Sequence, residues 1–261
     1  MQAGTCKLCH RQQDLCTSHI LPDFVYRTMK VDHRLVAIDG SRSGGDPVKI
    51  IQSGYTEPLL CRACEGLLNT WYEQPAKEFW FAMSGEPSPC GITLDLVLDA
   101  PPTYLVQGFD YASVKLFLLS LLWRAGVSAL PAFSQVNLGP HEAVLRRMLL
   151  DKNPGGEREY PCIVLMLTEN SQTIFCPVAQ REEQHRVYRF LICKLLLLYV
   201  VSNHADSLSY SRFSPRTNGS LIAQVRHFKT LPEVEHAASW IRNTSFPEHR
   251  LDLLLHRNRR P

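Results

Sequence analysis

The chain has 261 residues, a net charge of +3 and 45% apolar residues, a composition that is typical of a folded globular protein and excludes a largely disordered chain. The mild positive charge permits a nucleic-acid partner without requiring one. The length allows one large domain or a small module followed by a larger body.

Nine cysteines and the N-terminal sequence indicate the compartment. The opening segment MQAGTCKLCH lacks the apolar stretch of a secretory signal. An odd number of cysteines without such a signal argues against a disulfide framework, so we expect a reducing, cytoplasmic location. The longest apolar run, residues 190–201, is interrupted by Lys194 and is too short to cross a bilayer. We expect a buried strand or helix there and no membrane association.

The N-terminal third predicts a short helix and a hairpin. Pro22, followed by apolar side chains at helical spacing, favours a short amphipathic helix within residues 18–30. Residues 33–39 and 48–55 alternate as strands do, and the glycine-rich segment between them predicts their turn.

A further helix is predicted to begin near Cys61 or Arg62, because apolar residues recur at helical spacing from position 67 to position 72. Pro75 is expected to end or kink this helix. Residues 84–109 contain several prolines and glycines and predict a linker between two domains, although residues 93–99 alternate like a strand.

Residues 110–261 predict a mixed body of helices and antiparallel strands. An almost wholly apolar helix is expected over residues 110–126, with Asp110 as N-cap and Gly126 at the C′ position. The other expected elements are a helix at 140–151, a strand hairpin at 162–168 and 173–178, one bent strand or two at 187–201, a strand at 221–228 and a helix at 233–243.

Four cysteines form two Cys-x-x-Cys pairs, Cys6 with Cys9 and Cys61 with Cys64. A two-residue gap turns both thiolates toward one point, and two such pairs supply the four ligands of a tetrahedral structural zinc site. The insert between the pairs is longer than in a simple zinc ribbon, so we expect it to fold as its own hairpin. The alternative is two unrelated pairs of free thiols. We expect five further cysteines to be buried and inert, namely Cys16, Cys90, Cys162, Cys176 and Cys193.

His19 lies between the two cysteine pairs, ten residues after the first. An isolated histidine in a strand is commonly a half-buried structural residue. Its place between two zinc-binding turns makes it a candidate catalytic residue, because imidazole titrates near neutral pH.

The order Cys-x-x-Cys, Ser-His-Ile-Leu-Pro and Leu-Leu-Cys-Arg-Ala-Cys-Glu resembles the zinc-stabilised HNH endonucleases. These are treble-clef nucleases of the His-Me finger class, with the pattern Cys-x-x-Cys, Asp-His-Ile-x-Pro and Leu-Cys-x-x-Cys-His or -Asn. The resemblance covers residues 6–75. It implies an α+β protein in which residues 1–83 form a zinc-bound ββα-metal module, residues 84–109 a linker and residues 110–261 the body.

The resemblance also implies roles for matching residues. His19 falls on the general base, which takes a proton from the attacking water. Glu65 falls where the family has a metal-ligating His or Asn, and a carboxylate suits Mg²⁺ or Mn²⁺. Ser18 stands where the family has a ligating Asp or His. The family's middle Asn has no clear counterpart, and Ser53 and Thr56 are the nearby polar candidates.

The implied function is metal-dependent hydrolysis of DNA phosphodiester bonds in a bacterial, phage-defence setting, with structural zinc and catalytic Mg²⁺ or Mn²⁺. The departures at Ser18 and at the middle Asn leave a second hypothesis, a zinc-stabilised module that binds nucleic acid or protein on a catalytically degenerate scaffold. In both cases the body is the expected site of a protein partner.

Charged residues near the motifs complete the expectations. Glu73 is interpreted as a solvated helix residue, and Arg124 as the partner in an ion pair or helix cap. The candidates for phosphate contacts are Lys7, Arg11, Arg27, Lys30, Arg34, Arg42, Lys49 and Arg62.

Overall fold

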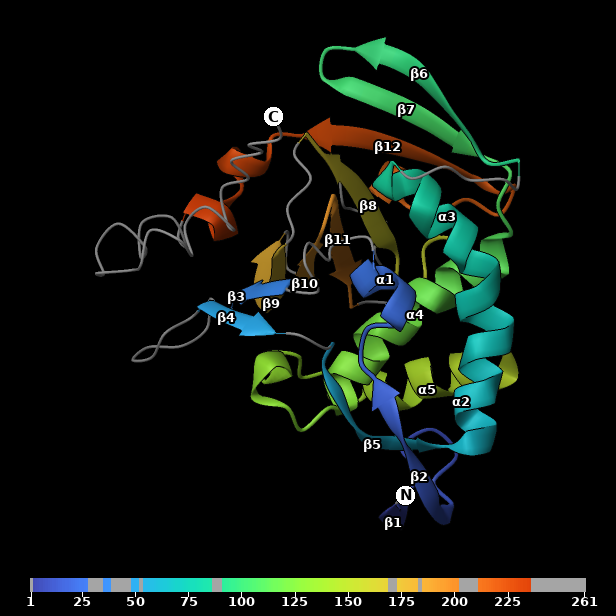
Figure 1. The fold of residues 1–261 in the computed structure, drawn as a ribbon. Helices are drawn as coiled ribbons and strands as arrows, with labels where there is room; N and C mark the ends of the chain where they lie inside the picture. The colour runs from blue at the N-terminus through green and yellow to red at the C-terminus, as the bar shows by residue number, and fades with distance from the viewer. Residues whose placement is uncertain are drawn as a thin grey trace.

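The computed structural model describes residues 2–27, 35–38, 48–51, 54–85, 91–168, 173–182, 185–201 and 211–235. It has a small sheet near the N-terminus, a large mixed sheet and a group of helices, so the expected α+β class is confirmed (Figure 1). Within the described parts of the chain, no helix has the length and apolar character needed to cross a bilayer.

The small sheet brings the motifs together. Its three antiparallel strands lie in the order β1 (Gln2–Thr5), β2 (Gln12–His19) and β5 (Thr56–Cys61). The turn between β1 and β2 holds the first cysteine pair, and β5 ends at the second. Helix α1 (Asp23–Arg27) follows β2 and confirms the short helix predicted after Pro22.

The large sheet has nine strands, and the order across it is β4 (Val48–Ile51), β3 (Leu35–Ile38), β9 (Thr173–Glu182), β10 (His185–Ile192), β11 (Leu195–Val200), β8 (Cys162–Leu167), β12 (Ser220–Arg226), β7 (Pro102–Gln107) and β6 (Thr93–Asp99). Two neighbouring pairs are parallel, β3 with β9 and β12 with β8. The prediction of a purely antiparallel body is therefore wrong.

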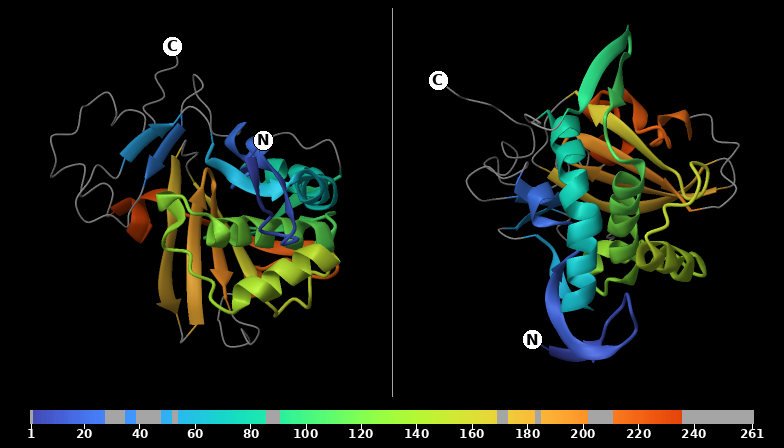
Figure 2. Two further views of the ribbon diagram at one scale, coloured as in Figure 1. Left: turned by 90° about the horizontal axis from the view of Figure 1, so that it is seen from below. Right: turned by 90° about the vertical axis from the view of Figure 1, so that its right-hand side faces the viewer.

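The central strands are buried on both faces, which explains the continuous apolar run in the sequence. In β11, Leu197 and Tyr199 belong to the apolar cluster that contains α4 (Tyr111–Val127), whereas Leu196 and Leu198 belong to a second cluster on the opposite face. The short 3₁₀ turns η3 (Ser211–Phe213) and η4 (Phe228–Thr230) contribute Phe213 and Phe228 to this second cluster. Figure 2 shows the longer helices gathered on one side of these strands.

Helix α4 matches its prediction at the start and departs from it at the end. The Asp110 carboxylate accepts the Ser113 backbone N–H at 2.8 Å and confirms the N-cap. The helix runs through Gly126 to Val127, so Gly126 is not at C′. A Cβ at Gly126 would lie 2.4 Å from Leu138 Cδ1, and this close approach explains the glycine. Helix α5 (His141–Asp151) agrees with the prediction for residues 140–151.

The helix after the second cysteine pair begins at Arg62, as predicted, but Pro75 does not end it. Helix α2 (Arg62–Leu68) continues through a π-helical turn η1 (Asn69–Glu73) into α3 (Gln74–Ser84). Pro75 lacks the N–H that an α-helix would direct at the Trp71 carbonyl, and the wider turn lies where that bond is lost.

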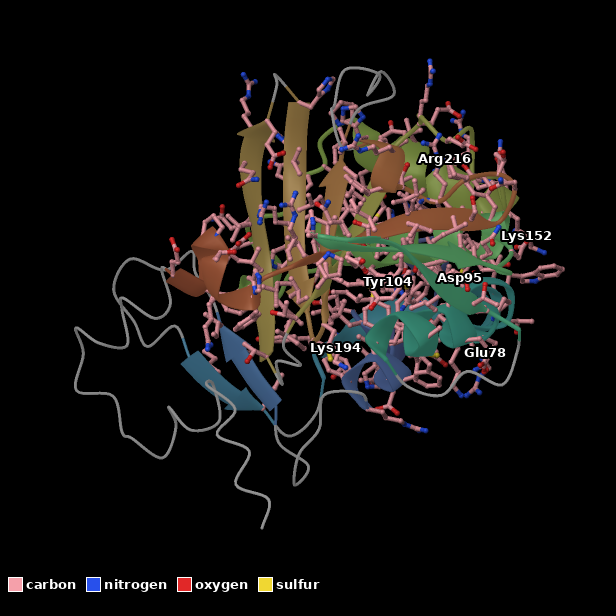
Figure 3. The ribbon with its side chains drawn as sticks, turned by 90° about the horizontal axis from the view of Figure 1, so that it is seen from above. Glu78, Asp95, Tyr104, Lys152, Lys194 and Arg216 are labelled. Carbon is pink, nitrogen blue, oxygen red and sulfur yellow. The ribbon has the colours of Figure 1, made fainter. Side chains whose placement is uncertain are left out.

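Two connections differ from the sequence prediction. Strands β8 and β9 do not pair with each other, because β11 and β10 lie between them. The expected linker, residues 84–109, contains the hairpin β6–β7 at the edge of the sheet, whose two strands carry Asp95 and Tyr104 in Figure 3. Residues 187–201 form two strands, which agrees with one of the two predicted alternatives.

The predicted hairpin of residues 33–55 is present as β3 and β4, but β3 also pairs with β9 of the body. The expected module and body therefore share a sheet, and the chain's division into separately folding domains stays a prediction. Most of the helix predicted at 233–243 and all of residues 236–261 lie outside the described residues, as do Ser53 and Cys90.

Candidate metal centre and adjoining cavity

The four predicted zinc ligands lie together. Their Sγ atoms are all within 4.8 Å of one another, and Cys9 Sγ lies 3.9 Å from Cys61 Sγ. Four sulfurs at the Zn–S distance of about 2.3 Å from one ion would lie about 3.8 Å apart in a tetrahedron. A disulfide needs about 2 Å, and all four thiols are free. The cluster therefore fits a structural zinc ion.

The surroundings of the cluster shift the pKa values of its thiols in different directions. Burial acts to raise the pKa of Cys6, but backbone N–H groups, including that of Cys61 at 3.3 Å, lower it below its ordinary value. Burial and the neighbouring thiols raise the pKa of Cys64. Four thiolates so close together need a cation to balance their charge, which a zinc ion provides.

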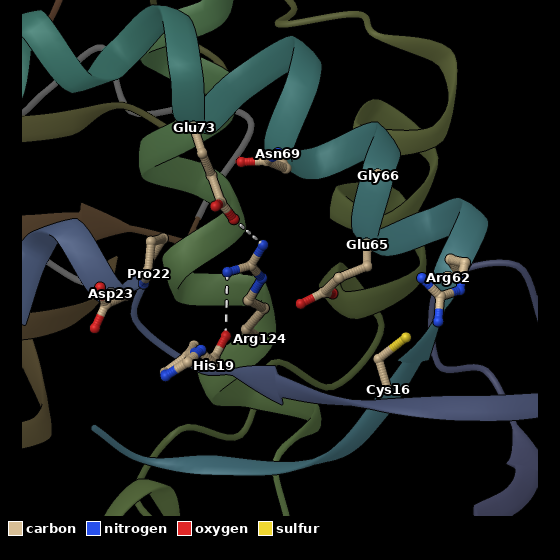
Figure 4. A pocket seen from close by; sticks show the side chains of 10 residues that line it. All are labelled: Cys16, His19, Pro22, Asp23, Arg62, Glu65, Gly66, Asn69, Glu73 and Arg124. Atoms are coloured by element: carbon tan, nitrogen blue, oxygen red, sulfur yellow. Dashed lines mark hydrogen bonds and ion pairs between the residues drawn. The ribbon is translucent and has the colours of Figure 1, made fainter. Parts of the chain in front are cut away.

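A cavity of about 400 Å³ lies beside the cluster and contains both predicted catalytic residues. His19 enters from the end of β2, and Glu65 comes from the first turn of α2, directly after Cys64 (Figure 4). Glu73 from η1 and Arg124 from α4 complete the wall opposite β2. The structure thus brings His19 and Glu65 into one cavity.

Ser18 lies behind this cavity and is fully buried. Its hydroxyl accepts the Leu60 backbone N–H at 3.2 Å and donates to Glu65 Oε2, also at 3.2 Å. The residue that stands at the family's ligand position therefore orients the Glu65 carboxylate. Burial raises the pKa of Glu65 above its ordinary value, against the opposing effect of the Arg124 charge.

Glu73 is not the solvated helix residue that the sequence indicated. Its side chain is 14% exposed and forms an ion pair with Arg124, whose side chain is 1% exposed. Arg124 also donates from Nη1 to the His19 carbonyl oxygen at 3.1 Å. The ion pair expected for Arg124 is confirmed, and its partners come from segments far away in the sequence.

Sequence reasoning did not single out Asn69, which also lines the cavity. Asn69 follows Glu65 by four residues, and this spacing on a helix is the signal that would have found it. Thr56, a candidate for the middle Asn, lies opposite His19 in the β2–β5 register. No side-chain hydrogen bond joins Thr56 to His19 within the described residues.

In the described parts of the chain, the cysteine cluster is the only group of three or more potential ligand residues close enough to hold one ion. A second metal in the cavity would therefore depend on Glu65 with few protein partners. Mg²⁺ commonly binds through one or two carboxylates and retains several waters, so this arrangement is adequate for it.

No family model, curated protein or solved structure matches the chain.

The other cysteines and the candidate phosphate-contact residues differ in their burial and in whether they line the cavity. Cys162, Cys176 and Cys193 are buried as expected, whereas Cys16 is half-buried and lines the cavity. Arg62 also lines the cavity, and Arg27 is engaged by Asp23 at 2.8 Å. Lys7, Arg11 and Lys49 are exposed; Lys30, Arg34 and Arg42 lie outside the described residues.

Proposed function

We propose that the protein is a zinc-stabilised endonuclease of the HNH type that hydrolyses DNA phosphodiester bonds with the help of Mg²⁺ or Mn²⁺. The observation that carries the proposal is the cavity shared by His19 and Glu65 next to the four-cysteine cluster. The order of hairpin, histidine at a strand end and helix after the second cysteine pair supports a treble-clef interpretation of this region.

Each residue has a distinct task in this proposal. The His19 imidazole takes a proton from a water molecule as that water attacks phosphorus. The P–O bond to the leaving sugar oxygen breaks, and that oxygen takes a proton from solvent. The Glu65 carboxylate, oriented by the Ser18 hydroxyl, holds the divalent ion. A bound Mg²⁺ or Mn²⁺ supplies positive charge at the scissile phosphate. The exposed Lys7 and Arg11, together with Arg62, are the proposed contacts to the DNA backbone.

Cleavage assays on the full-length protein test the proposal. Plasmid and single-stranded DNA are incubated with Mg²⁺ or Mn²⁺, and we expect His19→Ala to lower the cleavage rate by about 10²–10⁴-fold, the usual worth of a general base. His227→Ala is the control, because His227 is exposed at the start of η4 and does not line the cavity. Intact substrates with the wild-type protein, or equal rates for both variants, would contradict the proposal.

The bond between Ser18 and Glu65 favours a second candidate function. Ser18 brings no carboxylate to the cavity and occupies one oxygen of Glu65, which suits a module that binds nucleic acid or protein without cleaving it. A mobility shift with DNA that persists unchanged in His19→Ala, together with no cleavage, would favour this alternative.

A further inference from the structure

Arg124 is a buried cation in the wall of the cavity, and it reaches the cavity from the body of the protein. Its Nη1 donates to the His19 carbonyl, its Nη2 contacts Glu73, and its Nε has no hydrogen-bond partner among the described residues. Burying a guanidinium costs desolvation free energy, which can exceed the gain from its ion pair and hydrogen bonds. The burial of Arg124 is therefore better explained by the groups that it holds in place than by a gain in stability.

Arg124 acts on the backbone from which the imidazole of His19 projects. His19 is the last residue of β2, and the chain turns away after it through Ile20, whose N–H reaches the Tyr55 carbonyl. The Arg124 bond fixes the peptide carbonyl at that strand end. Glu73 fixes the guanidinium from the other side through a charge-assisted hydrogen bond. Glu73, Arg124 and His19 thus form a continuous connection across the cavity wall (Figure 4).

We propose that Arg124 is a positioning residue for His19, so that helix α4 of the body completes a site whose motifs all lie within residues 6–75. The expected change in kcat rests on the proposed nuclease function. The expected change in the position of the His19 imidazole does not. The positioning of His19 adds a role for residues 110–261 beyond the partner binding that is expected of them from the sequence.

Arg146 provides a matched control on the neighbouring helix α5. Its Nη1 donates to the Leu8 backbone carbonyl at 2.9 Å, and its Nε also has no hydrogen-bond partner among the described residues. Arg146 is half-buried and, like Arg124, connects the body to a backbone carbonyl of the N-terminal segment. It does not line the cavity and does not contact His19.

The experiment compares full-length Arg124→Met, Arg124→Lys and Arg146→Met with the wild type. In DNA cleavage with Mn²⁺, we expect Arg124→Met to lower kcat on the order of tenfold to a hundredfold with little change in KM, because a misplaced catalytic group costs rate. Arg124→Lys retains the charge but not the planar guanidinium, so its kcat should lie between those of the wild type and Arg124→Met. Arg146→Met should lower the melting temperature while kcat stays within about twofold.

A second measurement does not depend on activity. Long-range ¹H–¹⁵N spectra report the imidazole of each histidine, and the His19 signals are assigned by their loss in His19→Ala. We expect these signals to shift in both Arg124 variants and to stay in place in Arg146→Met. Glu73→Gln removes the negative charge but keeps a side-chain oxygen that accepts from Arg124, so it tests the same connection if Arg124→Met fails to fold. It should shift the His19 signals in the same direction.

The outcomes separate the two proposals. If the wild type cleaves no DNA, the nuclease proposal fails. The positioning role of Arg124 is then tested by the His19 imidazole signals alone. Unmoved His19 signals in the Arg124 and Glu73 variants would overturn that role, as would an equal loss of kcat in Arg124→Met and Arg146→Met.

Discussion

At the scale of single residues, the site depends on small polar contacts that hold larger groups. The Ser18 hydroxyl joins the Leu60 backbone to the Glu65 carboxylate, and backbone N–H groups favour the thiolate of Cys6. Unmade hydrogen bonds at such buried atoms cost about 1–3 kcal/mol each. The contacts around the cysteine cluster and the cavity are therefore energetically coupled to the fold.

The zinc ion gives the first prediction at this scale. We expect the purified protein to contain one zinc per chain, and Cys9→Ser to lose most of it, because a serine hydroxyl does not replace a thiolate ligand. The loss should lower the melting temperature, since metal binding free energy contributes directly to folding. Elemental analysis and thermal unfolding measure both effects.

Cys16→Ser is the control for the zinc prediction. Cys16 is half-buried and lines the cavity but does not belong to the four-cysteine cluster. This variant should keep its zinc. Full zinc content in Cys9→Ser, or none in the wild type, would refute the assignment.

At the scale of elements, α4 is the helix around which the body is built. It carries its own N-cap, an almost continuous apolar surface and two buried cations, Lys115 and Arg124. Lys115 donates to the Tyr111 hydroxyl at 3.1 Å and to the Gly156 carbonyl. Burial lowers the pKa of Lys115 to about 8, although Glu157 and Glu159 favour its charged form.

This lowered pKa predicts how stability changes with pH. Below pH 8 both the folded and the unfolded chain bind the proton, so the full cost of burying the ammonium opposes folding. Between about 8 and the ordinary value of 10.5, the folded chain has released the proton that the unfolded chain still holds. The contribution of Lys115 to the free energy of unfolding therefore rises with pH in this window, by on the order of 3 kcal/mol in total.

The comparison of wild type with Lys115→Met isolates this effect, because groups far from Lys115 titrate alike in both proteins. Its direct partner Tyr111 titrates above the pH range compared, since burial raises the Tyr111 pKa to about 12. We expect the difference in unfolding free energy, wild type minus variant, to be flat below about pH 7 and to rise toward pH 10. Urea unfolding at several pH values measures it. A difference that stays constant or falls over this range would show that folding does not lower the Lys115 pKa.

At the scale of the whole molecule, the N-terminal motifs and the body form a common core. One apolar cluster contains Cys6 and Leu8 of the first Cys-x-x-Cys turn together with Phe117 of α4 and Leu149 of α5. Strand β3 pairs with β9, and the Tyr72 hydroxyl donates to the Leu149 carbonyl. The body therefore supports the cavity directly, rather than through a linker.

A fragment of residues 1–83 tests this view of the molecule. We expect it to bind zinc through the four cysteines but to lack stable tertiary structure, because its apolar surface toward α4 and α5 would face water. Zinc content and a ¹H–¹⁵N spectrum of the fragment, compared with the full chain, check this. A dispersed spectrum and a cooperative thermal transition in the isolated fragment would instead establish it as an independent domain.

The sequence by itself determined the features that depend on neighbouring residues. The two Cys-x-x-Cys turns, the N-cap of α4 at Asp110 and the start of α2 at Arg62 all follow from local spacing and capping, because each involves groups a few turns apart at most. The resemblance to HNH endonucleases, rather than spacing alone, singled out His19 and Glu65, which line one cavity.

Only the tertiary structure decided the order of the strands and the fate of the isolated charges. The apolar strands β8 and β9 could pair with several strands, and their sequences do not say which strand lies beside which. Glu73 looks like a solvated residue, and the partner of Arg124 is undetermined, until α2–α3 and α4 are packed together. Their ion pair joins residues that lie 51 positions apart. Long-range packing, which local spacing does not encode, therefore turned a predicted surface carboxylate into part of the cavity wall.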